Sequence, residues 1–206
     1  MTASATSNTQ DIRRHMRRAR RALTRDLQQS HARQAALHFA RSRLPLHAST
    51  VAGYVAADGE LDLQDVFSRL FSMGKRVALP VIDPLTRRLE FFEHLPHAPL
   101  VAGRYGIPVP PPEARHIPTL AIDLVLTPLV AFDGTGSRVG MGGGYYDRTF
   151  GRLNRHLRPT LIGAAHSLQE APSHLKRQPW DVAIDGVLTE CGFARFSKRK
   201  FGTNKE

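Results

Sequence analysis

The segment IDLVLTPLVAF, residues 122–132, is the most strongly strand-like stretch of the chain. It consists mainly of Val, Leu and Ile, the composition of a strand that is buried on both faces of a parallel sheet. A glycine-rich segment follows directly, and a helix is predicted over residues 145–157. A strand, a glycine-rich turn and a helix in this order are typical of an α/β protein.

Strands and helices alternate on both sides of this segment. Apolar, β-like runs predict strands over 49–56, 76–82, 89–93, 160–166 and 182–189, and a helix over 61–74. Two helices with arginine-rich faces are expected from residue 11 to Ser42, with Thr24 ending the first and capping the second. The proline-rich segment 94–119 is predicted to be a long loop. The pattern indicates a three-layer α/β/α domain with a mainly parallel sheet and basic N-terminal helices.

Length and composition predict one folded unit. The 206 residues suit a single domain over 11–193, between a disordered leader (1–10) and a basic tail (194–206). A single cysteine, Cys191, excludes an intrachain disulfide and a zinc site built from cysteines. No apolar run reaches the roughly 18 residues of a membrane span, and no secretory signal stands at the start. We therefore expect a cytoplasmic protein that contacts no membrane.

The net charge of +11 is concentrated at the two ends of the chain. Residues 1–43 carry ten arginines against two aspartates, and residues 194–206 carry five basic residues against Glu206. The remaining body holds 14 basic and 15 acidic residues, so it is nearly neutral. A nucleic-acid-binding domain usually concentrates basic charge on the folded face that docks. The distribution favours a local anion site, or solubility, over nucleic-acid binding.

The segment DGTGSRVGMGGGYYDR, residues 133–148, is the first candidate site. Its glycines let backbone N–H groups approach an anion closely, and Arg138 could neutralise phosphate while Asp147 could hold Mg²⁺. It matches neither the dinucleotide-binding pattern nor a P-loop, because no Gly-Lys-Ser/Thr ends it. The alternative is a flexible connector.

Two acidic segments also follow or enter predicted strands. In DGELD, residues 58–62, Glu60 could accept hydrogen bonds from a donor-rich heterocycle, or the segment is a solvated turn in which Asp62 caps the next helix. In QPWDVAID, residues 178–185, Asp181 could support a metal or be an ordinary loop carboxylate. Asp185, inside an apolar strand, would need a partner.

The first helix carries arginines around its polar face, which favours a solvated surface for most of them. One or two could reach a phosphate, and an arginine-rich start also resembles a mitochondrial transit peptide. His166 follows a strand and could line a pocket.

Taken in order, these segments resemble the 5-formyltetrahydrofolate cyclo-ligase family, also called 5,10-methenyltetrahydrofolate synthetases. The resemblance extends over about residues 11–191 and is carried chiefly by YVAADGELDLQDVF, DLVLTPLVAFDGTGSRVGMGGGYYDRT and PWDVAIDGVLTE. It implies an ATP- and Mg²⁺-dependent ligase that closes 5-formyltetrahydrofolate to 5,10-methenyltetrahydrofolate and releases ADP and phosphate. It also implies 5-formyltetrahydrofolate and ATP as partners, and we expect a monomer.

The resemblance implies roles for individual residues. It makes Arg138 and Asp147 catalytic, and it places Mg²⁺ at Asp147 and Asp181. Folate would contact Val55, Glu60 and Tyr105. The residues implied in ATP binding are Arg13, Arg138, Val139, Gly140, Met141, Gly142, Gly143, Gly144, Tyr145 and Tyr146.

The chain departs from the family pattern at two positions. Thr9 stands where the family often has a lysine, and Met141 stands where many relatives carry a basic residue, so phosphate neutralisation would depend more on Arg138 and Arg148. Two other classes stay open on sequence alone. They are a sugar-phosphate isomerase or CoA-transferase-like enzyme, which would not need ATP, and a nucleic-acid-binding protein, which would show a steep salt dependence.

Overall fold

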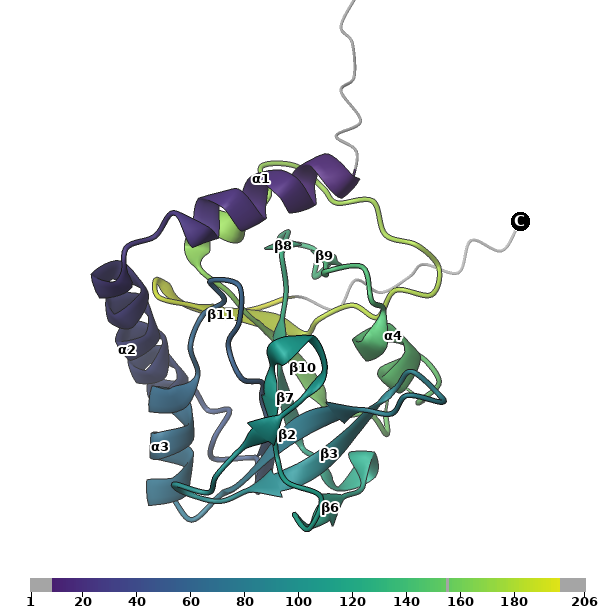
Figure 1. Cartoon of the computed structure of the whole chain (residues 1–206). Helices are drawn as coiled ribbons and strands as arrows, with labels where there is room; N and C mark the ends of the chain where they lie inside the picture. The colour runs from purple at the N-terminus through teal and green to yellow at the C-terminus, as the bar shows by residue number, and fades with distance from the viewer. Residues whose placement is uncertain (1–8, 155, 197–206) are drawn as a thin grey trace, which may run out of the picture.

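An eight-stranded mixed sheet forms the centre of the computed structural model, which describes residues 9–154 and 156–196 (Figure 1). Its order is β12-β11-β10-β7-β1-β2-β3-β6. The five central strands are parallel: β1 (Thr50–Ala52), β2 (Arg76–Ile82), β7 (Leu124–Pro128), β10 (Thr160–Ala164) and β11 (Gly186–Thr189). The outer strands β3 (Leu89–His94), β6 (His116–Ile117) and β12 (Gly192–Arg195) run antiparallel to their neighbours. The predicted mainly parallel sheet is confirmed.

Helices cover both faces of the sheet. Alternate residues of each strand point to opposite faces, so Val51 and Leu126 pack with α2 (Arg25–Arg41) and α3 (Gln64–Ser72). Ala52 and Val125 point the other way, toward α4 (Tyr145–Phe150). In Figure 1, α2 and α3 lie on one side of the sheet and α4 on the other. The predicted α/β architecture is therefore confirmed, with a smaller helical layer on the α4 face.

The N-terminal helices follow the predicted division closely. Helix α1 spans Thr9–Arg21, so it begins two residues inside the expected leader, and residues 1–8 lie outside the described part of the chain. Thr24 is the N-cap of α2, and its hydroxyl accepts the N–H of Leu27 at 3.3 Å. Ser42 is the C-cap, as expected.

The strand-like segment 122–132 does not form one continuous strand. β7 ends at Pro128, and the chain turns into β8 (Ala131–Phe132), which pairs with β9 (Arg138–Val139) in a separate small sheet. Between them, the carbonyls of Leu129 and Val130 accept hydrogen bonds from the side-chain amide of Gln169. Leu129 also accepts one from Arg20. The polar groups of this backbone are satisfied by side chains, which lets the chain leave the sheet while still buried.

The helix predicted over 145–157 is wrong in length. α4 ends at Phe150, Gly151 is its C-cap, and Asn154 starts a turn by accepting the N–H groups of Leu157 and Arg158 through its backbone carbonyl. Gly151 and Asn154 are residue types that end helices and open turns, and both outweigh the helical periodicity here.

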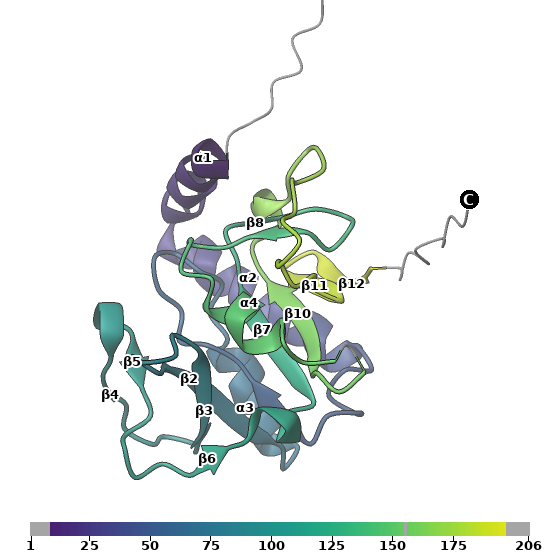
Figure 2. The ribbon, with the colours of Figure 1, turned by 90° about the vertical axis from the view of Figure 1, so that its right-hand side faces the viewer.

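Other boundaries also shift. The expected strands at 49–56 and 182–189 shorten to β1 and β11, and the helix expected over 61–74 shortens to α3. The proline-rich segment contains three short strands, including the hairpin of β4 (Val101–Ala102) and β5 (Pro108–Val109), which projects beside β2 and β3 in Figure 2. Strand β12 reaches Arg195, inside the expected tail, whereas residues 197–206 lie outside the described part. Asp185 precedes β11 and is paired with Arg158 at 2.8 and 3.0 Å.

Helix α1 is held onto the domain by a buried arginine. Arg20 has no solvent exposure, which contradicts a solvated role for this residue. Its guanidinium donates to the carboxylate of Asp58 at 2.9 Å, to the Asp58 carbonyl at 2.9 Å and to the Leu129 carbonyl at 3.1 Å. Arg17 and Arg21 bind the same carboxylate. Three arginines of one helix therefore converge on a single aspartate.

We expect Asp58→Asn to lower the free energy of unfolding by about 3 kcal/mol, because it removes the hydrogen-bonded counter-ion of the buried Arg20 and leaves only the more distant Glu60 carboxylate, at 3.7 Å. Burial opposes ionisation of Asp58, but the hydrogen bonds from Arg17, Arg21 and Arg20 outweigh it and lower the pKa of Asp58 to about 2. Because the folded-state pKa is depressed, this stability is present above about pH 4 and is lost as the pH falls toward 2. Urea unfolding at pH 7 and at pH 3 measures both effects.

The matched control is Arg14→Met. Arg14 pairs with Asp11 at 2.5 Å, but both side chains are exposed, so its loss should cost less than about 1 kcal/mol. Equal losses for the two variants, or a loss for Asp58→Asn that grows on acidification, would contradict the role given to Arg20.

Candidate functional site

The candidate site residues gather where the parallel strands end. The loop after β1 carries Asp58 and Glu60, and the segment after β7 carries the glycine-rich loop. Helix α1 lies over this edge and packs against β8 and against the short 3-10 helix Ser167–Gln169 that follows β10 (Figure 1). The carboxyl ends of parallel strands are the usual ligand-binding edge of an open α/β sheet. The predicted ATP and folate segments therefore share one edge.

The glycine-rich loop has a backbone that only glycine fits well. Gly142 and Gly144 have φ values of +99° and +63°, and a Cβ on Gly143 would lie 2.5 Å from the Tyr145 ring. The positive φ values disfavour side chains at Gly142 and Gly144, and a side chain at Gly143 would require the Tyr145 ring to move. Backbone conformation and local packing therefore explain these three glycines.

Two arginines bind the carbonyls of this loop from opposite ends. Arg13, on α1, donates from Nε to the Gly140 carbonyl at 2.8 Å. Arg148, on α4, donates to the Gly143 carbonyl and to the Arg87 carbonyl. Arg13 therefore does reach the predicted ATP segment, and Arg148 lies at the same loop. Met141, between them, is half exposed, and its sulfur lies 3.9 Å from Arg20.

Arg138 and Asp147 form an ion pair at 2.7 Å. The same Asp147 oxygen accepts the N–H of Val182 at 3.0 Å, and Arg138 donates to the Val182 carbonyl. Asp181, the neighbour of Val182, accepts the N–H of Gln178 at 2.8 Å. The two residues predicted as catalytic thus meet, and the segment of the second predicted metal ligand is bound to them.

Glu60 is mostly buried and makes its contacts within the 57–60 loop and with Arg20 of α1. Its carboxylate accepts the Ala57 N–H at 3.1 Å and lies 3.7 Å from Arg20. Burial raises the pKa of Glu60 above its usual value, against the opposing hydrogen bond from Ala57 and the charge of Arg20. Burial, with Glu60 nearby, also raises the pKa of Tyr146. The charge of Glu60, predicted for folate, therefore acts on Tyr146, predicted for ATP.

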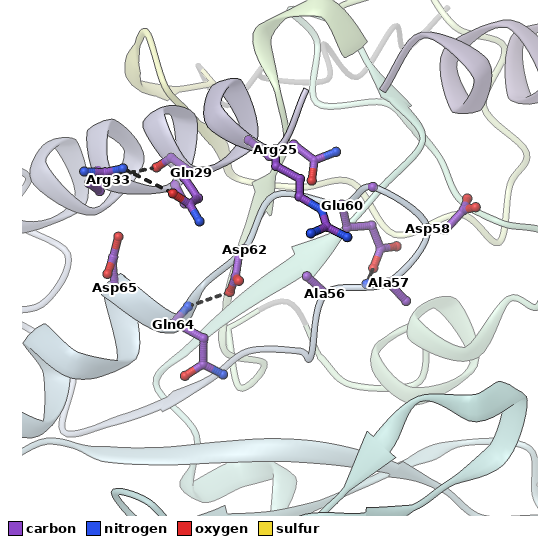
Figure 3. A pocket seen from close by; sticks show the side chains of 13 residues that line it. Arg25, Gln29, Arg33, Ala56, Ala57, Asp58, Glu60, Asp62, Gln64 and Asp65 are labelled. Atoms are coloured by element: carbon purple, nitrogen blue, oxygen red, sulfur yellow. Dashed lines mark hydrogen bonds between the residues drawn. The ribbon is translucent and has the colours of Figure 1, made fainter. Parts of the chain in front are cut away.

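A groove of about 550 Å³ opens beside this loop (Figure 3). Residues 56–60 form one wall, and polar residues of α2, among them Arg25, Gln29 and Arg33, form the other. Asp62 also lines the groove and accepts the N–H of Gln64, the first residue of α3, from one position before the N-cap, which is Leu63. Val55 is half-buried and packs against the core on the α2 side. The groove combines charged and amide side chains with the apolar surface of Ala32, Ala56 and Ala57, which suits a ligand with both hydrogen-bonding groups and a flat apolar part.

Tyr105 approaches the site from the β4–β5 hairpin. It is 67% exposed, and its hydroxyl lies 2.8 Å from that of Tyr145. This hydrogen bond lowers the pKa of Tyr105. The guanidinium groups of Arg104 and Arg148 lie over the rings of Tyr105 and Tyr145, respectively. The structure thus joins a residue predicted for folate to one predicted for ATP.

Several residues at this edge were missed as site residues. Asp58 stands inside the DGELD segment, but no sequence signal showed that three arginines would bind it. His166 is fully buried and contacts His31 and the Gly59 carbonyl; its position after a strand predicted only that it could line a pocket.

Among the described residues, no helix is long and apolar enough to cross a bilayer.

The chain is similar to known proteins over most of its length. A family model described as the 5-formyltetrahydrofolate cyclo-ligase family matches residues 5–190. The 5-formyltetrahydrofolate cyclo-ligase of Escherichia coli K12 is 39% identical over 176 residues, which cover 84% of this chain and 96% of that protein. The Haemophilus influenzae cyclo-ligase is 35% identical, with 89% and 98% covered.

Solved structures show the same fold. The NMR structure of Aquifex aeolicus 5,10-methenyltetrahydrofolate synthetase is 25% identical, covers 96% of this chain and 99% of that one, and has a TM-score of 0.78. A 5,10-methenyltetrahydrofolate synthetase from Mycoplasma pneumoniae covers 89% of this chain and 99% of that one, with 24% identity and a TM-score of 0.70. The similarity spans nearly the whole length of these proteins, and the chain belongs to the 5-formyltetrahydrofolate cyclo-ligase family.

Proposed function

We propose that this protein closes 5-formyltetrahydrofolate to 5,10-methenyltetrahydrofolate with consumption of ATP and release of ADP and phosphate. The observation that carries the proposal is the meeting of the 58–60 loop with the glycine-rich loop under α1, in a chain of this family. The reaction joins two ligands, so it needs two binding segments at one edge. A cytoplasmic monomer that acts on small molecules is part of the same proposal.

The chemistry requires positioning more than a protein nucleophile. The formyl oxygen attacks the γ-phosphorus of ATP, and ADP leaves. N10 then attacks the activated formyl carbon, loses its proton, and the C–O bond to phosphate breaks to release inorganic phosphate. Alignment of the two ligands and stabilisation of charge on the transferring phosphoryl group account for catalysis of this kind.

On this proposal, ATP phosphates bind at the glycine-rich loop. Arg13 and Arg148 lie at its two ends, and their bonds to the Gly140 and Gly143 carbonyls hold them there. Phosphate oxygens are charged acceptors, so guanidinium groups bind them more strongly than they bind carbonyls. α4 has only six residues, so its dipole contributes less than the predicted longer helix would.

The donor set fits Mg²⁺. Asp147 and Asp181 supply carboxylate oxygens, which this hard cation prefers, and both contacts that fix Asp147 are made by Oδ1. These two residues would hold the ion, with phosphate and water oxygens completing its coordination. The bound ion would neutralise phosphate charge. Arg138, through its ion pair, orients the Asp147 carboxylate.

Folate, on the same proposal, binds at Glu60 with Val55 and Tyr105 as further contacts. A carboxylate accepts two hydrogen bonds side by side from the planar donor edge of a pterin. The exposed Tyr105 ring is available to stack on an aromatic group.

An absorbance assay for 5,10-methenyltetrahydrofolate tests the function. The product should form only when 5-formyltetrahydrofolate, ATP and Mg²⁺ are all present, with one ADP released for each product molecule. Product formation without ATP, or ATP hydrolysis uncoupled from it, would contradict the proposal.

Asp147→Asn should retain the fold, since an amide oxygen can still accept from Arg138 and Val182. Its kcat should fall by about 100-fold or more, because a neutral amide is a poor ligand for Mg²⁺. Steady-state rates against Mg²⁺ concentration check this, with the exposed Asp26→Asn as the matched control. An unchanged Mg²⁺ requirement would remove Asp147 from the metal site.

Glu60→Gln should raise the KM for 5-formyltetrahydrofolate by about 10-fold or more and leave the KM for ATP nearly unchanged, because the amide loses one charged acceptor while keeping the contact to Ala57. Glu90→Gln, on the exposed side of β3, is the matched control. A change confined to ATP binding would reverse the assignment of the two ligands.

A further inference from the structure

A second group of chemically reactive side chains lies at the same edge of the sheet. His31 of α2, His166 after β10 and Glu190 after β11 place one ligand atom each within 4.8 Å of one another. The two Nδ1 atoms are 2.9 Å apart, and His31 Nδ1 lies 3.7 Å from the Glu190 carboxylate. No role in the proposed reaction uses these three residues.

Neighbouring groups fix two of the three side chains in the cluster. His166 Nε2 lies 3.2 Å from the Gly59 carbonyl, which can only accept, so Nε2 carries the proton and the Nδ1 lone pair accepts from His31. Glu190 accepts the N–H of Ser167 at 3.0 Å and the Ser167 hydroxyl. Histidine metal ligands characteristically donate their other ring nitrogen to a carbonyl or carboxylate, and carboxylate ligands are themselves hydrogen-bonded.

The protonation states also suit metal ligands. Burial, with the nearby His31, lowers the pKa of His166 to about 4, so its ring is neutral at neutral pH. Burial opposes ionisation of Glu190, but the hydrogen bonds from Ser167 lower its pKa below the usual value. The cluster therefore offers neutral imidazole nitrogen and carboxylate oxygen together.

We propose that His31, His166 and Glu190 bind a divalent transition-metal ion, for which Zn²⁺ is the best match. Two imidazoles and one carboxylate are an established three-residue zinc donor set, with a fourth position left for water. Mg²⁺ prefers oxygen ligands, which distinguishes this site from Asp147 and Asp181. Without the ion, His31 Nδ1–H donates to His166 Nδ1 and holds the two rings together. Metal binding at His31 Nδ1 would require this proton to move, by exchange with solvent, to Nε2 of the same ring, so that both rings bind as neutral imidazoles.

The bound ion would restrict the motion of the 58–60 loop through the hydrogen bond from His166 to Gly59. The Gly59 carbonyl that accepts from His166 lies between Asp58 and Glu60, so a bound metal would stiffen the loop that carries both residues. This consequence rests on the proposed function, but metal binding does not, and the two can fail separately.

The test is a Zn²⁺ titration of the full-length protein, freed of metal with a chelator and monitored by competition with a chromogenic chelator. We expect one tight site per chain, and a rise in the melting temperature with one equivalent of Zn²⁺. His31→Ala and Glu190→Gln should each weaken this site by about 100-fold, and Ser167→Ala by about 10-fold. Co²⁺ in place of Zn²⁺ should give visible absorption bands that disappear in His31→Ala.

His47→Ala, at an exposed histidine, is the matched control and should leave the titration unchanged. His31 and Glu190 are the chosen sites because both are partly exposed, and the melting temperature of each metal-free variant reports whether it folds. If a folded His31→Ala or Glu190→Gln variant binds Zn²⁺ as tightly as the parent, or if the parent has no tight site, the cluster is only a hydrogen-bonded histidine pair and the proposal is wrong.

Discussion

The ion pair between Arg20 and Asp58 is the interaction on which the arrangement of this edge depends. A fully buried guanidinium is costly unless each of its donors is paired, and here its contacts join α1, the 58–60 loop and the end of β7. The planar fork of arginine reaches several acceptors at once, which the single ammonium of lysine cannot do in the same geometry. Three segments that are distant in sequence are therefore fixed relative to one another by one side chain.

The position of α1 follows from this anchor, and the position of Arg13 follows from α1. Arg13, Arg17 and Arg20 are four and three residues apart, so they lie along one side of the helix. Once Arg17 and Arg20 bind Asp58, Arg13 is carried to the Gly140 carbonyl, two turns away. The same helix thus holds the loop proposed for folate at one end and the loop proposed for ATP at the other. Replacement of Arg20 would therefore change the positions of both loops.

The sequence was sufficient for the elements with strong local signals. The α/β class, the parallel central strands and the Thr24 cap could all be predicted, because apolar periodicity and capping chemistry are local properties. The break after Pro128 could not, because it depends on side chains from elsewhere, such as Gln169. The end of α4 at Phe150 did have local signals, Gly151 and Asn154, but the helical periodicity was given more weight than these turn residues. The burial of Arg20 was missed because arginine side chains are usually solvated, although Arg20 lies four residues after Met16 and three before Leu23, beside the apolar stripe of the helix. Its partner Asp58 could not be predicted, because that contact joins distant segments. The proximity of Arg138 to Asp147 and of Arg13 to Gly140 was anticipated only through family resemblance.

The orientation of the glycine-rich loop constrains how phosphate could bind there. In a planar trans peptide, the carbonyl of one residue and the N–H of the next point in opposite directions. Because the Gly140 and Gly143 carbonyls face Arg13 and Arg148, the N–H groups of Met141 and Gly144 face away from those arginines. If the proposed function holds, a phosphate cannot accept hydrogen bonds from these arginines and from these N–H groups at the same time while the loop keeps this conformation. Either the guanidinium groups leave the carbonyls for the more strongly accepting phosphate oxygens, or the peptides rotate. Rotation of the 143–144 peptide, which has a glycine on both sides, meets the least steric resistance.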